Sequence, residues 1–270
     1  MDQLLFREFS LQELREPQTW QQFLHIQQPW IEAGVTRWLQ LLSPLPSEKP
    51  LNHPVFVLGA ALQTQPDRLL GTLVGTWQEA PIARFDDLLE KPLEHPHLAT
   101  DRPLDGVWHF IAVTVAHEAE GQHLGRALVG AGLAWLDHNA PHARARTLSP
   151  AVGLPKLMEL VENLPNPQRE AILHLADDQG RPLLEILRLH LGAGATLEAI
   201  LPDSRRDEVR SGRVTLRFAY EREPDKREQQ KLAYHAWIER RKILIQQGNA
   251  RKVADHWLLP DCHDAQIGLA

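Results

Sequence analysis

The alternation of apolar and polar positions along the chain separates helical from extended segments. From Ser10 to Leu42, apolar residues recur at helical spacing, with Ser10 placed to cap the first turn and Pro17 placed to interrupt the pattern. Two apolar runs follow, at 54–62 and 69–77, and the polar sequence QTQPDR separates them. Two such runs around a short turn-forming segment predict a β-hairpin.

The pattern continues less regularly after the hairpin. Residues 78–106 contain four prolines and little periodicity, which predicts a long loop with a short turn at 86–89, either a lid or binding segment or a surface excursion. An apolar run at 110–115 then leads into an Ala- and Leu-rich helix that ends near His138. Further strands are expected at 144–148, 196–201 and 214–220, and further helices at 154–164, 167–175 and 182–190. From Glu221 onward the chain is highly charged with helical spacing, which predicts a C-terminal helical appendage.

Composition narrows the functional classes. The 270 residues are 43% hydrophobic and 24% charged, which is typical of a globular protein with a sizeable core. The net charge of −6 argues against general nucleic-acid binding, because no basic surplus exists to neutralise phosphates. The basic pair Arg205-Arg206 lies between Asp203 and Asp207, which is typical of a solvated surface turn.

Other features of the composition indicate the cellular setting. A single cysteine, Cys262, excludes an internal disulfide framework and fits a reducing compartment. The N-terminus lacks a basic-then-apolar signal pattern, and no apolar stretch is long enough to span a bilayer. We therefore expect a soluble, cytoplasmic protein without a membrane partner. No metal is expected either, because no convincing ligand set surrounds the histidines at 95, 97, 138 and 142.

The segment TVAHEAEGQHLGRALV, residues 114–129, carries the first chemical signal. A strand that leads into a helix through a tight turn presents free backbone N–H groups at the helix N-terminus, and these groups suit a phosphate or pyrophosphate. Gly125 and Ala127 are small, either for close approach of a ligand or for plain packing of the helix on a sheet. A dinucleotide site is not indicated, because the Gly-x-Gly-x-x-Gly pattern and alternating βαβ units are missing.

This segment resembles the Gln/Arg-x-x-Gly-x-Gly/Ala signature of the GNAT acyltransferase superfamily, and the likeness extends from about Asn52 to Tyr220. It implies an α+β fold with a mixed, mostly antiparallel central sheet flanked by helices, in a domain of residues 1–222 followed by a charged helical appendage, 223–270. It also implies a turn that holds the pyrophosphate of coenzyme A, while the preceding strand contacts the pantetheine arm. The turn residues are Gln122, His123, Leu124, Gly125, Arg126 and Ala127, and the strand residues are Val113 and Val115.

Two further stretches, ARTLSPAVGL (145–154) and RLHLGAGATLEAIL (188–201), resemble malonyl-CoA decarboxylases and the GNAT-like loading domains of some polyketide synthases. That resemblance implies catalytic roles for Ser149, or Thr147 beside it, and for His190. A hydroxyl and a histidine suit the loss of CO2 from a malonyl thioester, which leaves an enolate that needs hydrogen-bond donors and then a proton. The alternative roles are structural: a strand residue, a turn residue before Pro150 and a helix-end residue.

Three functions remain open at this point. The first is an acyltransferase that uses a coenzyme A thioester, acetyl-CoA or malonyl-CoA, with an acyl carrier protein as a further candidate donor or partner. In many GNAT acetyltransferases a tyrosine after the fifth strand protonates the departing thiolate, and neither Tyr220 nor Tyr234 lies there. This departure favours the second function, a decarboxylase; the third is a non-catalytic acyl-CoA-binding module. His117 and Glu118 are candidate bases or solvated turn residues, and the oligomeric state is open.

Overall fold

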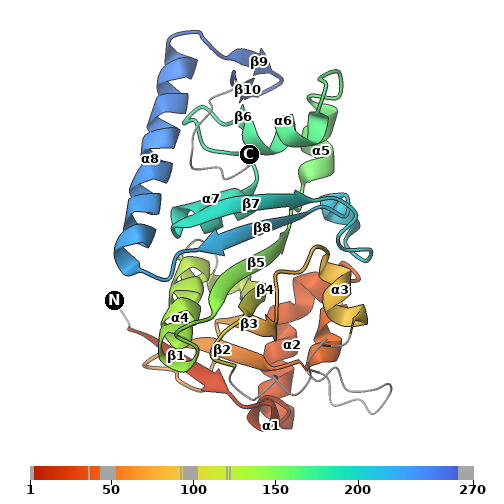
Figure 1. Cartoon of the computed structure of the whole chain (residues 1–270), viewed down its shortest axis with the longest axis vertical. Coiled ribbons are helices and arrows are strands. Elements are labelled where there is room, and N and C mark those ends of the chain that lie inside the picture. The colour runs from red at the N-terminus through yellow and green to blue at the C-terminus, as the bar shows by residue number, and fades with distance from the viewer. Residues whose placement is uncertain are drawn as a thin grey trace. The chain divides into compact units, whose positions relative to one another are not determined.

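A computed structural model describes residues 3–35, 37–42, 53–91, 93, 103–119, 121 and 123–260 (Figure 1). The chain forms two compact units, Met1–Leu148 and Ser149–Ala270, and each is described by itself. The division expected at residue 222 is a different one and stays a prediction. Across the described residues, no helix combines the length and apolar character needed to cross a membrane.

The strands of the main sheet lie in the order β1-β2-β3-β4-β5-β8-β7. The pairs β1–β2, β2–β3, β3–β4 and β7–β8 are antiparallel, whereas β4 and β5 are parallel. This sheet confirms the mixed, mostly antiparallel architecture expected from the sequence. Its strands are β1 (Leu4–Phe9), β2 (Val55–Leu62), β3 (Gly71–Gln78), β4 (Val107–Val115), β5 (Arg144–Pro150), β7 (Ala195–Leu201) and β8 (Thr215–Tyr220).

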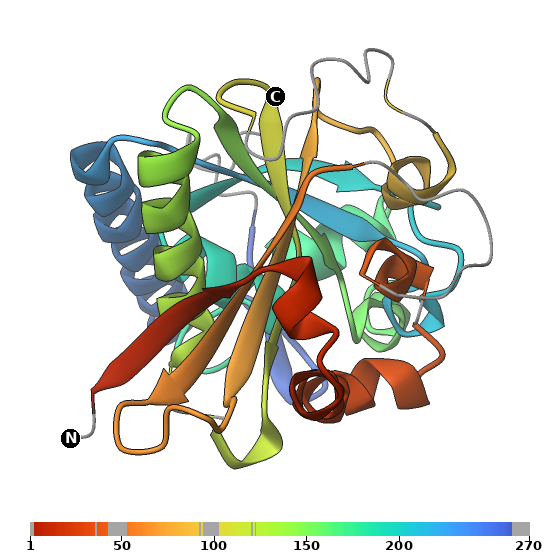
Figure 2. The same ribbon diagram turned by 90° about the horizontal axis from the view of Figure 1, so that it is seen from below.

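Helices cover both faces of the strands in the first unit (Figure 2). The glycine Gly71 of β3 lies directly under Leu124 and Leu128 of α4, so this face packs closely on that helix. On the opposite face, the amide of Gln27 in α2 donates to the Thr72 hydroxyl at 2.7 Å and accepts from Thr114 at 2.8 Å. The helices of this unit are α1 (Leu11–Leu14), α2 (Pro17–Glu32), α3 (Phe85–Glu90) and α4 (Leu124–Asn139), with 3-10 turns at Arg37–Leu41 and His117–Ala119.

The second unit combines the β7–β8 hairpin with helices and a small second sheet. The order of that sheet is β6-β10-β9. The buried Arg241 of α8 donates hydrogen bonds to the carbonyl oxygens of Leu173 and Leu175, which fixes α8 against the end of α6. The elements are α5 (Leu154–Glu159), α6 (Pro167–Leu173), α7 (Glu185–Gly192), α8 (Pro224–Gln246), β6 (Leu175–Ala176), β9 (Arg251–Val253) and β10 (His256–Leu258), with a 3-10 turn at Val209–Ser211.

The structure differs from the sequence-based expectations in several places. Strands β1, β6, β9 and β10 were not predicted, and the expected C-terminal helix is followed by the β9–β10 hairpin. The prediction of a solvated surface turn at Arg205-Arg206 is wrong for the first residue: Arg205 is 2% exposed, whereas Arg206 is exposed. Charge pattern alone does not reveal burial here, because the flanking residues Ser204 and Glu208 are buried with Arg205.

Candidate functional site

Ser149 is the penultimate residue of β5, which ends at Pro150. Its side chain is 7% exposed, and its hydroxyl oxygen is 2.8 Å from Nε2 of His190. The structure therefore brings together two of the residues that the sequence singled out 41 positions apart. Thr147, two residues earlier on the same strand, is fully buried and remains a second candidate.

His190 occupies the last turn of α7, whose apolar residues Leu187 and Leu191 hold the helix in the core. The ring of His190 is 1% exposed, and its centroid lies 4.6 Å from that of Phe218 on β8. Nδ1 of His190 is 2.7 Å from the hydroxyl oxygen of Tyr220. Both ring nitrogens are thus engaged, and the imidazole orientation is fixed from two sides.

Tyr220 reaches His190 because of strand pairing. The register of β7 and β8 places Tyr220 opposite Ala195, which follows the end of α7 closely in the chain. Successive side chains of a strand point to opposite faces, so Phe218 and Tyr220 share one face of β8. Both face the His190 ring, and the three side chains Ser149, His190 and Tyr220 form a continuous hydrogen-bonded chain inside the second unit.

Burial determines the charge of the His190 imidazole in this hydrogen-bonded set of side chains. Desolvation lowers the pKa of His190 to about 3, because the buried site disfavours the imidazolium. The imidazole is therefore neutral at pH 7, with one nitrogen that donates and one that accepts. If Tyr220 donates to Nδ1, then Nε2–H donates to Ser149, and the serine hydroxyl proton is left to point elsewhere. The opposite tautomer would let Nε2 accept the serine proton.

The phosphate-binding turn expected from the sequence lies in the first unit, at the start of α4. The helix begins at Leu124, preceded by His123 in the left-handed conformation at φ 58°. The N–H groups of Arg126 and Ala127 both donate to the His123 carbonyl. The N–H groups that precede them, those of Leu124 and Gly125, have no acceptor within the helix. Gln122 lies outside the described residues.

The strand residues assigned to the pantetheine arm, Val113 and Val115, are half-buried on β4. In the antiparallel register they pair with Leu73 and Gly71 of β3. Their place directly before the turn agrees with the strand–turn–helix order that the sequence indicated. Their role toward a ligand stays a prediction.

Glu118, one of the two candidate bases, is exposed and pairs with Arg68 at 2.9 Å. A backbone hydrogen bond and the Arg68 guanidinium lower the pKa of this carboxyl, so it is a weaker base than an ordinary glutamate. His117 is also exposed. The described part of the chain contains no cluster of three or more His, Cys, Asp or Glu residues placed to hold a metal ion, and residues 95 and 97 lie outside it.

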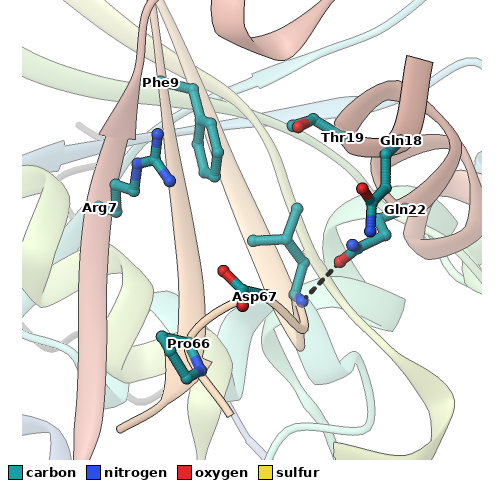
Figure 3. Close-up of a pocket in the computed structure, with 8 residues that line it drawn as sticks. Arg7, Phe9, Gln18, Thr19, Gln22, Pro66 and Asp67 are labelled. Carbon is teal, nitrogen blue, oxygen red and sulfur yellow. Dashed lines mark hydrogen bonds between the residues drawn. The ribbon is translucent and has the colours of Figure 1, made fainter. Parts of the chain in front are cut away.

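A cavity of about 360 Å³ lies elsewhere in the first unit, between β1, α2 and the β2–β3 loop (Figure 3). Arg7, Gln22 and Asp67 contribute polar groups from these three elements, and the side-chain Oε1 of Gln22 accepts from the Leu69 N–H at 3.0 Å. None of the residues that line it was singled out by the sequence motifs. The cavity is lined by none of the three side chains Ser149, His190 and Tyr220.

No family model and no curated protein matches the chain. Solved structures do match. The loading GNATL domain of CurA from Lyngbya majuscula is 15% identical, with 82% of this chain and 98% of that domain covered at a TM-score of 0.53. Malonyl-CoA decarboxylase from Agrobacterium vitis is also 15% identical, with 88% of this chain and 67% of that chain covered at a TM-score of 0.60.

A third similar structure is the GphF GNAT-like decarboxylase in complex with isobutyryl-CoA, which is 13% identical, with 81% of this chain and 100% of that chain covered at a TM-score of 0.54. These likenesses show that the chain has the GNAT fold, as the sequence resemblance implied. At such low identity they show the fold alone.

Tyr220 is the residue of this site that sequence reasoning missed. The family resemblance leads one to expect a tyrosine after the fifth strand, whereas Tyr220 ends β8. Its position at the end of an apolar strand was visible in the sequence. Its contact with His190 was not visible in the sequence, because the pairing of β7 with β8 and the packing of α7 bring Tyr220 to His190.

Proposed function

We propose that this protein is an enzyme that decarboxylates a malonyl-type coenzyme A thioester. The observation that carries the proposal is the hydrogen bond between Ser149 and His190, 2.8 Å long and buried. The buried serine and imidazole offer hydrogen-bond donors in a site with little exposure to solvent. Such donors stabilise a developing enolate oxygen more strongly than they would in water.

The reaction must stabilise the electron pair that the broken carbon–carbon bond releases, and it must then supply a proton to C2. The bond between the malonyl carboxylate and C2 breaks, CO2 leaves, and the electron pair moves to C2 and the thioester carbonyl oxygen as an enolate. C2 then takes the proton of the Ser149 hydroxyl, Nε2–H of His190 restores the serine, and the Tyr220 hydroxyl proton passes to Nδ1. Solvent returns a proton to Tyr220, and a reverse shift of protons along the three side chains, with solvent protons exchanged at both ends, restores the starting tautomer of His190. The net reaction takes up one proton and gives CO2 and the acetyl-type thioester.

The neutral state of His190 favours this chemistry over attack by Ser149 on the thioester. A serine nucleophile needs a histidine that becomes imidazolium, and a buried aspartate stabilises that charge in serine hydrolases. Here the group on Nδ1 is a tyrosine hydroxyl, and burial lowers the pKa of His190 to about 3. Proton relay along the chain creates no imidazolium, so the same geometry serves it without that cost.

Coenzyme A binding is proposed for the first unit. The start of α4 offers free N–H groups and the positive end of a helix dipole to the pyrophosphate, with His123, Leu124, Gly125, Arg126 and Ala127 around it and Gln122 before it. Support comes from the GNAT fold and from one structure of that fold that holds isobutyryl-CoA. Val113 and Val115 would line the pantetheine arm.

An acyltransferase is the second candidate, because the GNAT fold and the α4 turn fit any acyl-CoA donor. It differs from the first in needing an acceptor, and an acyl carrier protein is one candidate acceptor or donor. In a decarboxylating transferase the relay would act first and the acetyl-type group would move afterwards. A purely non-catalytic acyl-CoA-binding module is disfavoured by the fully engaged Ser149–His190–Tyr220 chain.

The test is incubation of the purified protein with malonyl-CoA and, separately, acetyl-CoA, followed by mass spectrometry of the thioesters. We expect conversion of malonyl-CoA to acetyl-CoA, lowered at least about a hundredfold in His190→Ala and Ser149→Ala. Ser211→Ala is the matched control, since Ser211 is also fully buried in the second unit and donates to the Glu208 carbonyl instead.

Each outcome separates the candidates. Turnover lost only in the two site variants supports the decarboxylase. Binding of both thioesters without turnover contradicts it and leaves the transferase, which is then tested with an acyl carrier protein as acceptor. If neither thioester binds, the assignment of the α4 turn fails as well.

A further inference from the structure

The cavity of the first unit has a lining that is polar and comes from three separate elements (Figure 3). Its volume of about 360 Å³ lies at the lower end of the range of about 300–1,000 Å³ that small-molecule sites occupy, so it suits a small metabolite. The lining residues are Arg7 and Phe9 from β1, Gln18, Thr19 and Gln22 from α2, and Pro66, Asp67 and Leu69 from the β2–β3 loop.

Arg7 supplies the positive charge of the cavity, and its guanidinium is held from two sides. Nη2 donates to Glu13 at 2.6 Å, and the guanidinium carbon lies 4.8 Å from the centre of the Phe9 ring. Glu13 is fixed in turn, because it accepts from the backbone N–H and the hydroxyl of Ser10. A guanidinium has five N–H donors, so the bond to Glu13 leaves others for a ligand on a group whose position is already set.

Asp67 supplies the negative charge of the cavity. It is exposed, and within the part of the chain that the structure describes its carboxylate takes part in no hydrogen bond or ion pair. The neighbouring Arg68 pairs with Glu118 at 2.9 Å instead, and Arg7 pairs with Glu13. Two opposite charges therefore line one cavity without pairing with each other.

Helix α2 adds hydrogen-bond donors on the side of the cavity across from Arg7 (Figure 3). Oε1 of Gln22 accepts from the Leu69 N–H at 3.0 Å, which orients the amide and leaves its NH2 group to donate elsewhere. The hydroxyl of Thr19 lines the same side. The cavity thus offers donors on two sides and the Asp67 carboxylate between them.

This arrangement of charges favours a ligand that carries a carboxylate and an ammonium group together. The ligand carboxylate would accept from Arg7 and from the Gln22 amide, and the ammonium group would donate to Asp67, each through a charge-assisted hydrogen bond. Asp67 repels a simple anion and Arg7 repels a simple cation, so either charge alone gains less than the two together. Phe9 and Leu69 offer apolar surface to the rest of the molecule.

We propose that this cavity binds a free α-amino acid, with its carboxylate toward Arg7 and Gln22 and its ammonium group toward Asp67. The proposal does not rest on the proposed enzymatic function, since the cavity shares no residue with the Ser149–His190–Tyr220 chain or with the α4 turn. The Arg7 side chain is 56% exposed, so solvent weakens the ion pairs, and we expect a dissociation constant of about 0.1–5 mM.

The test titrates the full chain with each of the common α-amino acids, up to about 50 mM, while amide NMR spectra record which residues shift. Two probes then dissect the amino acid that binds: its carboxamide lacks the carboxylate, and its N-acetyl derivative lacks the ammonium group. We expect one bound molecule per chain, with shifts at Arg7, Gln22, Asp67 and Leu69. Both probes should bind at least about tenfold more weakly than the amino acid.

Two variants link each charge of the ligand to its partner. Asp67→Asn and Arg7→Gln should each weaken binding of the amino acid at least about tenfold. Asp67→Asn should not weaken the N-acetyl derivative further, because the group that Asp67 binds is already gone. The matched controls, Asp255→Asn and Arg251→Gln, change exposed charges on the β9–β10 hairpin and should leave binding unchanged.

Thermal melting checks that all four variants stay folded. The proposal is overturned if no amino acid binds in this range, or if the shifts lie away from the cavity. A carboxamide that binds as tightly as the amino acid would overturn it too, since the site would then recognise a cation alone. So would variants of Arg7 and Asp67 that bind like the controls.

Discussion

The side chains of Ser149, His190 and Tyr220 form a chain of neutral hydrogen-bonding groups. Each hydroxyl can both donate and accept, and the neutral imidazole has one nitrogen of each kind, so the direction of all the bonds can reverse together. Low local dielectric strengthens such a network and makes the loss of one member costly. The behaviour of the site therefore depends on Tyr220 as well as on the two residues that resemble known catalytic groups.

Replacement of Tyr220 by phenylalanine should lower the decarboxylation rate about 10- to 100-fold, because it removes the hydroxyl that fixes and reprotonates Nδ1 of His190. Tyr234→Phe is the matched control, since Tyr234 is the other tyrosine of the chain and is likewise buried, but on α8. Steady-state kinetics with malonyl-CoA measure both. Equal rates for the two variants would contradict a role for Tyr220.

At this scale the sequence indicated part of the site. Ser149 and His190 were found because their surroundings, LSP and HLGAGA, carry a resemblance that is local in the chain. Tyr220 has no such local signature. Its role depends on a strand register, which is a relation between segments that the sequence does not state.

At the scale of elements, one buried arginine joins two helices of the second unit. Arg241 of α8 is 2% exposed, and its guanidinium donates at 2.7 Å and 3.0 Å to the carbonyl oxygens of Leu173 and Leu175. The end of a helix leaves carbonyl groups without partners inside the helix. Arg241 satisfies the carbonyl of Leu173, the last residue of α6, and also bonds that of Leu175, the first residue of β6. The Trp237 ring lies 4.0 Å from the same guanidinium and covers it.

Arg241→Met should lower the free energy of unfolding by about 2–4 kcal/mol, because two buried carbonyl oxygens lose charged donors while the apolar stem is kept. Arg240→Met, at the exposed neighbouring position, should change it by no more than about 0.5 kcal/mol. Urea denaturation followed by circular dichroism gives both values. If the two variants lose the same stability, the capping role is wrong.

The sequence predicted well those elements whose apolar residues recur at regular spacing. The helix at α4 and strands β2, β3, β5, β7 and β8 lie close to their expected bounds, since long apolar patterns state which face is buried. Strand β1 was missed because LLFREF shows no regular alternation, and β6, β9 and β10 because two or three residues show no period at all.

At the scale of the whole molecule, the buried histidine links stability to pH. The pKa of His190 is about 3 in the folded chain and near 6.5 when the chain is unfolded. Between these values the unfolded state binds a proton that the folded state does not, so stability is complete above pH 6.5 and decreases as the pH falls toward 3. The change is about 1.4 kcal/mol for each pH unit in that window.

From pH 7 to pH 5, the unmodified protein should therefore lose about 2 kcal/mol through His190. His190→Gln has no proton to bind in this range, so its own loss between the two pH values should be smaller by that amount, whatever its stability at pH 7. Denaturant titrations at both pH values measure the difference. An identical loss in both proteins would show that His190 is protonated in the folded state.

The sequence by itself determined the order of most elements, the strand–turn–helix signal at α4 and the candidacy of Ser149 and His190, because each is a property of neighbouring residues. Tertiary structure decided the rest: the burial of Arg205, the edge position of β1, and the contact of Tyr220 with His190. These depend on which strands pair and which faces are covered. Long-range packing sets both, and with them the hydrogen-bond partners and the charge of the buried groups.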